Sequence, residues 1–219
     1  MDLAVAASAA VVAAVLGIAA AYWQHLLYRD TEHRVRGQGV AYFARLGFVA
    51  IACGVTTGLA FRPDHYDLLP AALTAVFCFV LAVLSSADFE RRLLPNRLMY
   101  PALLAAVLFS WAWPDRSAVD IAIGGAVAAG AAVGLFALGV LFGNARGSGL
   151  GFGDVKLLVL LGLLAGWPAV GPAVVIGILL GGIPALALIL TGRRNVHFSY
   201  GPYLSAGGAI VLLFPGNFV

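Results

Sequence analysis

The stretch LLPAALTAVFCFVLAVLSSA, residues Leu68–Ala87, contains no charged residue and is followed at once by Asp88. A helix needs about 20 mostly apolar residues to cross the hydrocarbon core of a bilayer. We therefore expect a transmembrane helix here, with a carboxylate at its end. That acid is notable, because Asp and Glu are costly in hydrocarbon and usually face a cavity or a partner.

The composition of the whole chain also indicates a membrane protein. Of its 219 residues, 62% are hydrophobic and 11% are charged, whereas soluble domains are near half apolar and about a quarter charged. The net charge is +3, but in a membrane protein basic residues usually report the orientation of the helices rather than an anionic partner. Nucleic-acid binding is not expected.

Apolar segments recur along the chain and predict an all-α, polytopic membrane helix bundle of about eight transmembrane helices. We expect one transmembrane domain over residues 1–219. The sixth segment is short for a transmembrane helix, and an earlier start, within Leu150–Asp154, is the alternative for it. The segments are residues 3–27, 40–61, 68–87, 98–113, 120–142, 155–167, 171–191 and 200–214.

Basic residues alternate between the connections and predict the topology. Connections one, three, five and seven are rich in arginine, so the positive-inside rule makes them cytoplasmic and places both termini outside. The first of them, residues 29–39, is too short to form a core of its own. The arginines on the cytoplasmic side are Arg29, Arg34, Arg36, Arg91, Arg92, Arg97, Arg146, Arg193 and Arg194, against Arg62 and Arg116 opposite.

Two acids differ from the others, which fall in loops or at outer helix ends. Asp88 ends the third segment and Asp154 begins the sixth. Two helices separate them, so the chain has returned to the same face and the topology permits a pair. Two carboxyls held close share a proton. The ionised member can then take a proton from water while the neutral member donates to a scissile carbonyl oxygen.

This chemistry requires no metal, cofactor or covalent nucleophile, and the sequence predicts none. Cys53 and Cys78 are the only cysteines, and both lie in apolar runs. The four histidines are scattered among loops and helix ends, so the ligands of a usual structural zinc site are lacking. They are His25, His33, His65 and His197.

Glycines precede Asp154 and are frequent in later segments. Gly151 and Gly153 are expected to allow unusual backbone angles and the close approach of a substrate backbone. An alternative is that Gly147, Gly149 and these two form a flexible loop, with Asp154 as a helix N-cap. Most other glycines are expected to let helices pack closely: Gly124, Gly125, Gly130, Gly134, Gly139, Gly177, Gly181 and Gly182.

Three segments stand out at the expected helix ends: Gly151-Phe152-Gly153-Asp154-Val155-Lys156-Leu157-Leu158, Asp88-Phe89-Glu90-Arg91-Arg92-Leu93-Leu94-Pro95-Asn96 and Tyr200-Gly201-Pro202-Tyr203-Leu204. Together they resemble the type IV prepilin peptidases, which belong with presenilin among the GxGD aspartyl proteases. The resemblance implies that Asp88 and Asp154 are the catalytic pair. It also implies cleavage of prepilins or pseudopilins, usually just after a glycine, at the cytoplasmic face of the plasma (inner) membrane.

Neighbours of the pair are expected to shape the site. Pro95 should break the third helix and fix the turn back into the membrane. Asn96 should satisfy backbone groups of that turn, with help in holding the site as the alternative. Glu90 is expected at the lip of the site or in a substrate loop. Lys156 is expected to reach the membrane interface, with electrostatic tuning of the pair as the alternative. Gly201 and Pro202 are expected to shape a helix start, and the resemblance puts them near the substrate groove.

The chain resembles a short form of this family. Many bacterial members carry a cytoplasmic insert with paired CxxC motifs after the first helix, and they also methylate the new N-terminus. Here that position holds only residues 29–39, without cysteine, so methyltransferase activity is not expected. Membrane lipids are the other expected partner, and the sequence gives no indication of oligomeric state.

Two other functions stay open on the sequence alone. A small proton-coupled transporter could use Asp88 and Asp154 as proton-carrying acids, although no internal repeat relates their segments. An inactive structural subunit of a secretion or type IV pilus assembly is a third interpretation. Nothing in the motifs favours it, because both acids are present.

Overall fold

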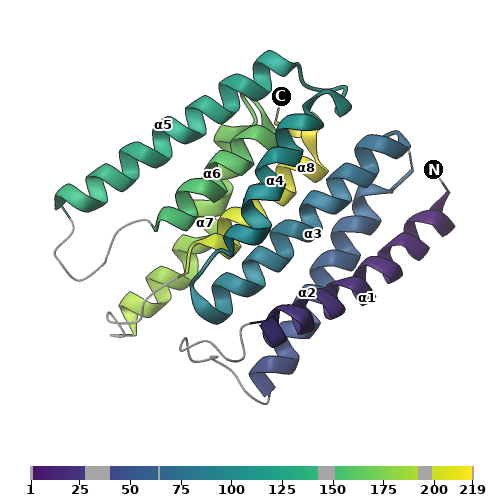
Figure 1. Cartoon of the computed structure of the whole chain (residues 1–219), viewed down its shortest axis with the longest axis horizontal. Helices are drawn as coiled ribbons and strands as arrows, with labels where there is room; N and C mark the ends of the chain where they lie inside the picture. The colour runs from purple at the N-terminus through teal and green to yellow at the C-terminus, as the bar shows by residue number, and fades with distance from the viewer. Residues whose placement is uncertain (1, 28–39, 64, 143–150, 192–198, 219) are drawn as a thin grey trace. The chain divides into compact units, whose positions relative to one another are not determined.

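The described residues of this chain are entirely helical apart from turns and connections. The computed structural model describes residues 2–27, 40–63, 65–142, 151–191 and 199–218, and these form no strand, which confirms the all-α prediction. The predicted loop 29–39 lies outside them, as do Arg146, Arg193 and Arg194. The elements are α1 Leu3–Leu27, α2 Val40–Ala60, α3 Leu68–Arg91, α4 Asn96–Leu108, η1 Ser110–Ala112, α5 Ala118–Phe142, α6 Phe152–Ala165, α7 Val170–Leu190, α8 Gly201–Leu213 and η2 Pro215–Asn217 (Figure 1).

Each predicted apolar segment coincides with a helix to within a few residues, and two differences bear on the site. The helix α3 continues to Arg91, so Asp88 lies inside its last turn rather than after it. The helix α6 begins at Phe152, so Asp154 lies inside its first turn. Both acids are therefore placed by helical backbone and not by loops.

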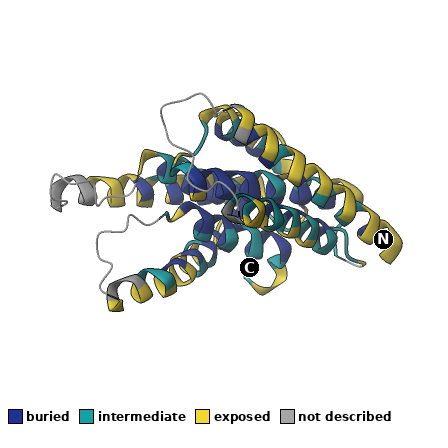
Figure 2. Ribbon diagram, turned by 90° about the horizontal axis from the view of Figure 1, so that it is seen from below, coloured by how far each residue is buried: buried dark blue, intermediate teal, exposed yellow. Residues whose placement is uncertain are grey.

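Within the residues that the structure describes, five helices are long and apolar enough to cross a bilayer, and the chain is a multi-pass membrane protein. Exposed residues run along these helices (Figure 2). Many of them have large apolar side chains, which suits a lipid environment and would be unfavourable in water. The helices α4, α6 and α8 have 13 or 14 residues and cover only about 20 Å. Eight crossings and outside termini therefore stay predictions. The five candidate spans are Leu3–Gln24, Tyr42–Ala60, Leu68–Arg91, Ala118–Ala137 and Val170–Ala187.

The chain forms two compact units, Met1–Pro95 and Asn96–Val219. In the first unit α1 packs against α2 and α3, and α2 packs against α3 (Figure 1). A small core of Ala21, Val49, Cys53 and Ala82 lies between these helices. This unit ends with the helix that carries Asp88.

In the second unit α6 is the central helix. It contacts α4, α5, α7 and α8. Its leucines at 157, 160, 161 and 164 are all buried. Burial together with contacts to four neighbouring helices shows that α6 is covered by protein rather than by lipid. The helix that carries Asp154 is thus held from several sides within this unit.

Glycines bring the helices of the second unit close together. A Cβ built at Gly124 of α5 would lie 2.6 Å from the carbonyl oxygen of Gly162 in α6, and one built at Gly177 of α7 would lie 2.8 Å from the Cα of Leu204 in α8. The packing interpretation is therefore confirmed at these glycines. It is wrong within the described part of the chain for Gly130, Gly134 and Gly182, where a Cβ would meet no atom within 4 Å.

The substitution Gly124→Ala should lower the free energy of unfolding by about 1–3 kcal/mol, because the new methyl group meets backbone atoms that cannot move aside. The matched control Gly130→Ala, on the same helix in open space, should be neutral or stabilising by up to about 1 kcal/mol. Thermal unfolding of both variants in the same detergent checks this. Equal losses in the two variants would contradict the close α5–α6 packing.

Candidate active site

Asp88 lies buried in the last turn of α3. The helix ends before Arg92, whose φ of 54° is in the left-handed region and whose N–H donates a hydrogen bond of 2.8 Å to the Asp88 carbonyl oxygen. That conformation costs an L-residue with a Cβ roughly 1 kcal/mol. The last residue of α3 is Arg91, and Arg92 is its C-cap. Proline removes the hydrogen bond to the residue four before it and clashes with that residue's carbonyl group, so the end of the helix at Arg91 is consistent with a break caused by Pro95, which directly precedes α4.

Glu90 is the second acid at this end of α3, and its carboxylate forms an ion pair with Arg45 of α2. A second cation, Arg91, has its Nη2 3.8 Å from the Glu90 Oε1. The Glu90 side chain is only 1% exposed, so the structure places it inside the α2–α3 contact rather than at an open lip. A buried carboxylate needs such partners to remain ionised. The ion pair ties the end of α3, with Asp88, to α2.

Asp154 lies in the first turn of α6, and its Oδ2 accepts a hydrogen bond of 3.2 Å from the Gly151 N–H. Gly151 is the N-cap and Asp154 the third helical residue. The N-cap alternative for Asp154 is thus wrong, and its side chain instead reaches back as the acidic half of a capping box. A negative charge is also favourable beside the positive end of a helix dipole.

The glycines beside Asp154 do not adopt unusual backbone angles. Gly151 has φ −71° and ψ 152°, which is extended backbone open to any residue, and Gly153 is part of the first turn of α6. Among the described glycines a positive φ is found at Gly166, which ends the same helix. The expectation of glycine-specific angles is therefore wrong at both positions. Close approach of a substrate backbone stays a prediction.

Lys156 joins the first turns of α6 and α4. Its Nζ donates hydrogen bonds of 2.8 Å to Asn96 Oδ1 and 3.0 Å to Tyr100 Oη. The same atom lies 4.7 Å from the ring centroids of Tyr100 and Phe152. Asn96, expected to hold the turn, thus binds Lys156 with its side chain. Sequence reasoning missed Tyr100, although it stands four residues after Asn96 and so on the same helix face.

Gly201 and Pro202 open α8, as predicted, with Pro202 in the first turn, where the missing N–H of proline is harmless. Both are buried. The helix they begin packs against α6 and α7. Their place near a substrate groove stays a prediction.

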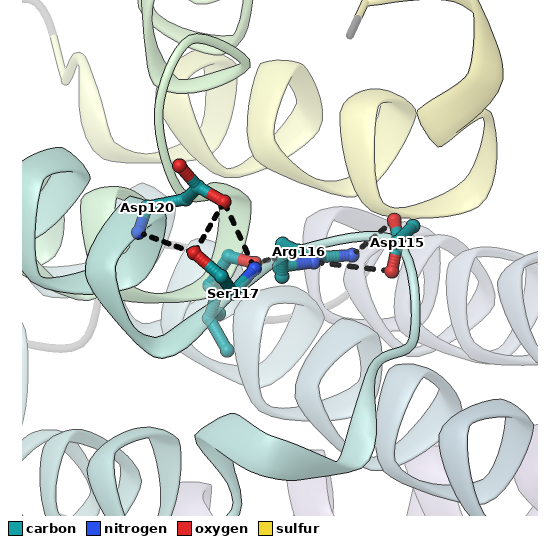
Figure 3. A network of polar contacts seen from close by, with 5 residues as sticks. Asp115, Arg116, Ser117 and Asp120 are labelled. Carbon is teal, nitrogen blue, oxygen red and sulfur yellow. Dashed lines mark hydrogen bonds and ion pairs between the residues drawn. The ribbon is translucent and has the colours of Figure 1, made fainter.

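A separate polar cluster lies at the other end of α6 and the start of α5 (Figure 3). Arg116 donates to both carboxylate oxygens of Asp115 and to the Leu164 carbonyl oxygen. The Ser117 N–H and hydroxyl both donate hydrogen bonds to Asp120 Oδ2, of 2.9 Å and 2.7 Å, and the Asp120 N–H donates back to that hydroxyl. This is a capping box, and these acids serve the helix ends. A cavity of about 130 Å³ lies beside them.

The substitution Glu90→Ala should cost about 3 kcal/mol of stability, because it leaves Arg45 buried without its partner. The double variant Arg45→Met/Glu90→Ala should be more stable than the sum of the two single losses predicts. Urea or thermal unfolding of the four proteins in detergent checks this. Additive losses would show that the ion pair does not hold α2 and α3 together.

The predicted catalytic pair is divided between the two units. Asp88 belongs to the first and Asp154 to the second. The pairing itself stays a prediction and is taken up as a proposal below.

Comparison with known proteins places the chain in a family. The model of the type IV leader peptidase family matches residues 75–186. Proteins named "Prepilin leader peptidase/N-methyltransferase" are similar to it. That of Aeromonas hydrophila is 37% identical over 189 residues, 83% of this chain and 62% of the relative. That of Escherichia coli K12 is 35% identical over 167 residues, 74% of this chain and 68% of the relative.

The protein of that name from Burkholderia pseudomallei strain 1026b is 35% identical over 150 residues, 66% of this chain and 47% of the relative. The chain thus spans about half the length of this curated relative. No solved structure matches the chain. The family match covers about half of the chain and includes both Asp88 and Asp154. The chain belongs to the type IV leader peptidase family.

Proposed function

We propose that this chain is a membrane aspartyl endopeptidase that removes the leader from prepilins or pilin-like precursors. The observation that carries the proposal is that the family match, residues 75–186, spans both acids, and that each acid stands in a terminal turn of a helix. The names of the relatives support the same reaction and substrate class. We assign Asp88 and Asp154 as the catalytic residues.

In this mechanism the two carboxyls hold one proton and one water molecule between them. The ionised carboxylate takes a proton from the water, whose oxygen attacks the scissile carbonyl carbon. The neutral carboxyl gives its proton to the carbonyl oxygen, which produces a tetrahedral diol. A proton then passes from the pair to the amide nitrogen and the C–N bond breaks. The products are the leader, with a new carboxyl group, and the mature protein, with a new amine.

We place the reaction at the cytoplasmic face of the inner membrane. Arg91, Arg92 and Arg97 follow Asp88 closely in the chain, and Arg146 precedes Asp154. Arginine-rich connections favour the cytoplasmic side, so both acids are assigned to that side by charge. We do not propose N-methylation of the product, an activity that the names of the relatives also carry.

The substitutions Asp88→Asn and Asp154→Asn should each reduce cleavage by about 10²–10⁴-fold or more, because each removes one half of the acid–base chemistry. The measurement is the rate of leader removal from a prepilin by the purified variants, with gel mobility on co-expression as a second readout.

The matched control is Asp67→Asn, at the opposite end of the helix that carries Asp88. Asp67 precedes α3 and forms no side-chain capping hydrogen bond, so its loss should leave cleavage unchanged. Normal processing by either Asp88→Asn or Asp154→Asn would overturn the catalytic assignment. An equal loss in all three variants would also count against it.

A further inference from the structure

Lys156 is the only lysine of the chain, whose other basic side chains are arginine and histidine. It stands two residues after Asp154, in the first turns of α6. Lysine on a membrane helix usually extends its flexible stem toward water and headgroups. Here its ammonium group binds protein groups instead, with two hydrogen bonds and the ring of Phe152 within cation–π distance.

These contacts suit an ammonium group in particular. Two of its three N–H donors are used, by an amide oxygen and a phenol oxygen. The Phe152 ring, whose centroid lies 4.7 Å from the same atom, contributes a cation–π attraction of about 0.5–1 kcal/mol at an exposed site. A long side chain loses much rotamer freedom when it is fixed, so several simultaneous partners are needed to hold it in one place. Lys156 has them.

The partners of Lys156 show what it joins. Asn96 is the first residue of α4. A short stretch of chain, which ends at Pro95, connects it to Asp88. Tyr100 lies one turn further along α4. Phe152 and Lys156 itself flank Asp154 in α6. The ammonium group therefore ties the start of one helix to the start of the other.

We propose that Lys156 is a positioning residue of the peptidase. Its ammonium group binds Asn96 and Tyr100 and so holds the start of α4 against the first turn of α6. The residues that follow Asp88 lead directly into the start of α4, and the first turn of α6 carries Asp154. This role rests on the proposed function, because the benefit is the correct placement of the two acids. Misplacement by about 1 Å can lower a rate by about 10²-fold, so the loss of this contact should act on kcat rather than on KM.

Kinetics of leader cleavage provide the first test. Lys156→Met and Asn96→Ala should each lower kcat roughly 10–100-fold with little change in KM. The double variant should be no slower than the slower single variant, because both remove the same contact. Lys156→Arg should restore part of kcat, since a guanidinium can also donate to Asn96. A raised KM at unchanged kcat, or effects that multiply, would overturn the proposal in favour of substrate or lipid binding.

The single lysine permits a second test that does not depend on activity. An amine-acylating reagent can modify only Lys156 and the terminal amine, and peptide mass spectrometry separates the two. The reaction at Lys156 should be slow in the wild-type protein in lipid and faster in Asn96→Ala and Tyr100→Phe. The control Asn217→Ala, in η2, should leave the rate unchanged.

The two tests separate the two proposals. Equal acylation rates in all variants of a protein that cleaves prepilin would overturn the role of Lys156 and leave the proposed function standing. Slow acylation that depends on Asn96 and Tyr100, in a wild-type protein that cleaves no prepilin, would support the contact. That result would overturn the peptidase assignment instead.

Discussion

An ionised carboxylate is strongly disfavoured in hydrocarbon, and this constraint governs where acids stand in the described part of the chain. Asp88 occurs in the last turn of α3 and Asp154 in the first turn of α6. Glu90, the buried acid beside Asp88, is compensated by Arg45 and Arg91. The other residues of α3 and α6 are almost all apolar. Polar chemistry is thereby concentrated at helix ends, while the rest of each helix is suited to lipid or to other helices.

The helix α6 shows how such an end is made rigid. It is too short to cross a full hydrocarbon core, and it is surrounded by α4, α5, α7 and α8. Gly124 and Gly162 let the backbones of α5 and α6 approach closely. In its first turn Asp154 accepts a hydrogen bond from the Gly151 N–H, and Lys156 donates one to Asn96 of α4. Catalytic groups work best when packing and neighbouring hydrogen bonds fix their rotamers, and this turn has both.

The sequence predicted the helices well and the side-chain partners poorly, for one physical reason. A membrane helix requires a long apolar run, which is readable locally, but a run that is apolar all round does not tell which neighbour covers which face. The partners of Glu90 and Lys156 depend on those neighbours, so Arg45 and Tyr100 were missed. The exact end of α3 could not be predicted from the sequence either, because Arg92, its C-cap, is not a residue type that favours the left-handed conformation.

Pairing of Asp88 and Asp154 is the central claim, and crosslinking during turnover tests it most directly. Phe89→Cys and Phe152→Cys place thiols at exposed neighbours of the two acids, in a chain whose own cysteines are replaced by alanine. A short thiol crosslinker should join them in membranes, and more so with a non-cleavable prepilin. Phe89→Cys with Trp167→Cys, just beyond the other end of α6, should not crosslink. A protein that cleaves prepilin but never forms the first crosslink, although both thiols react singly, would contradict the account.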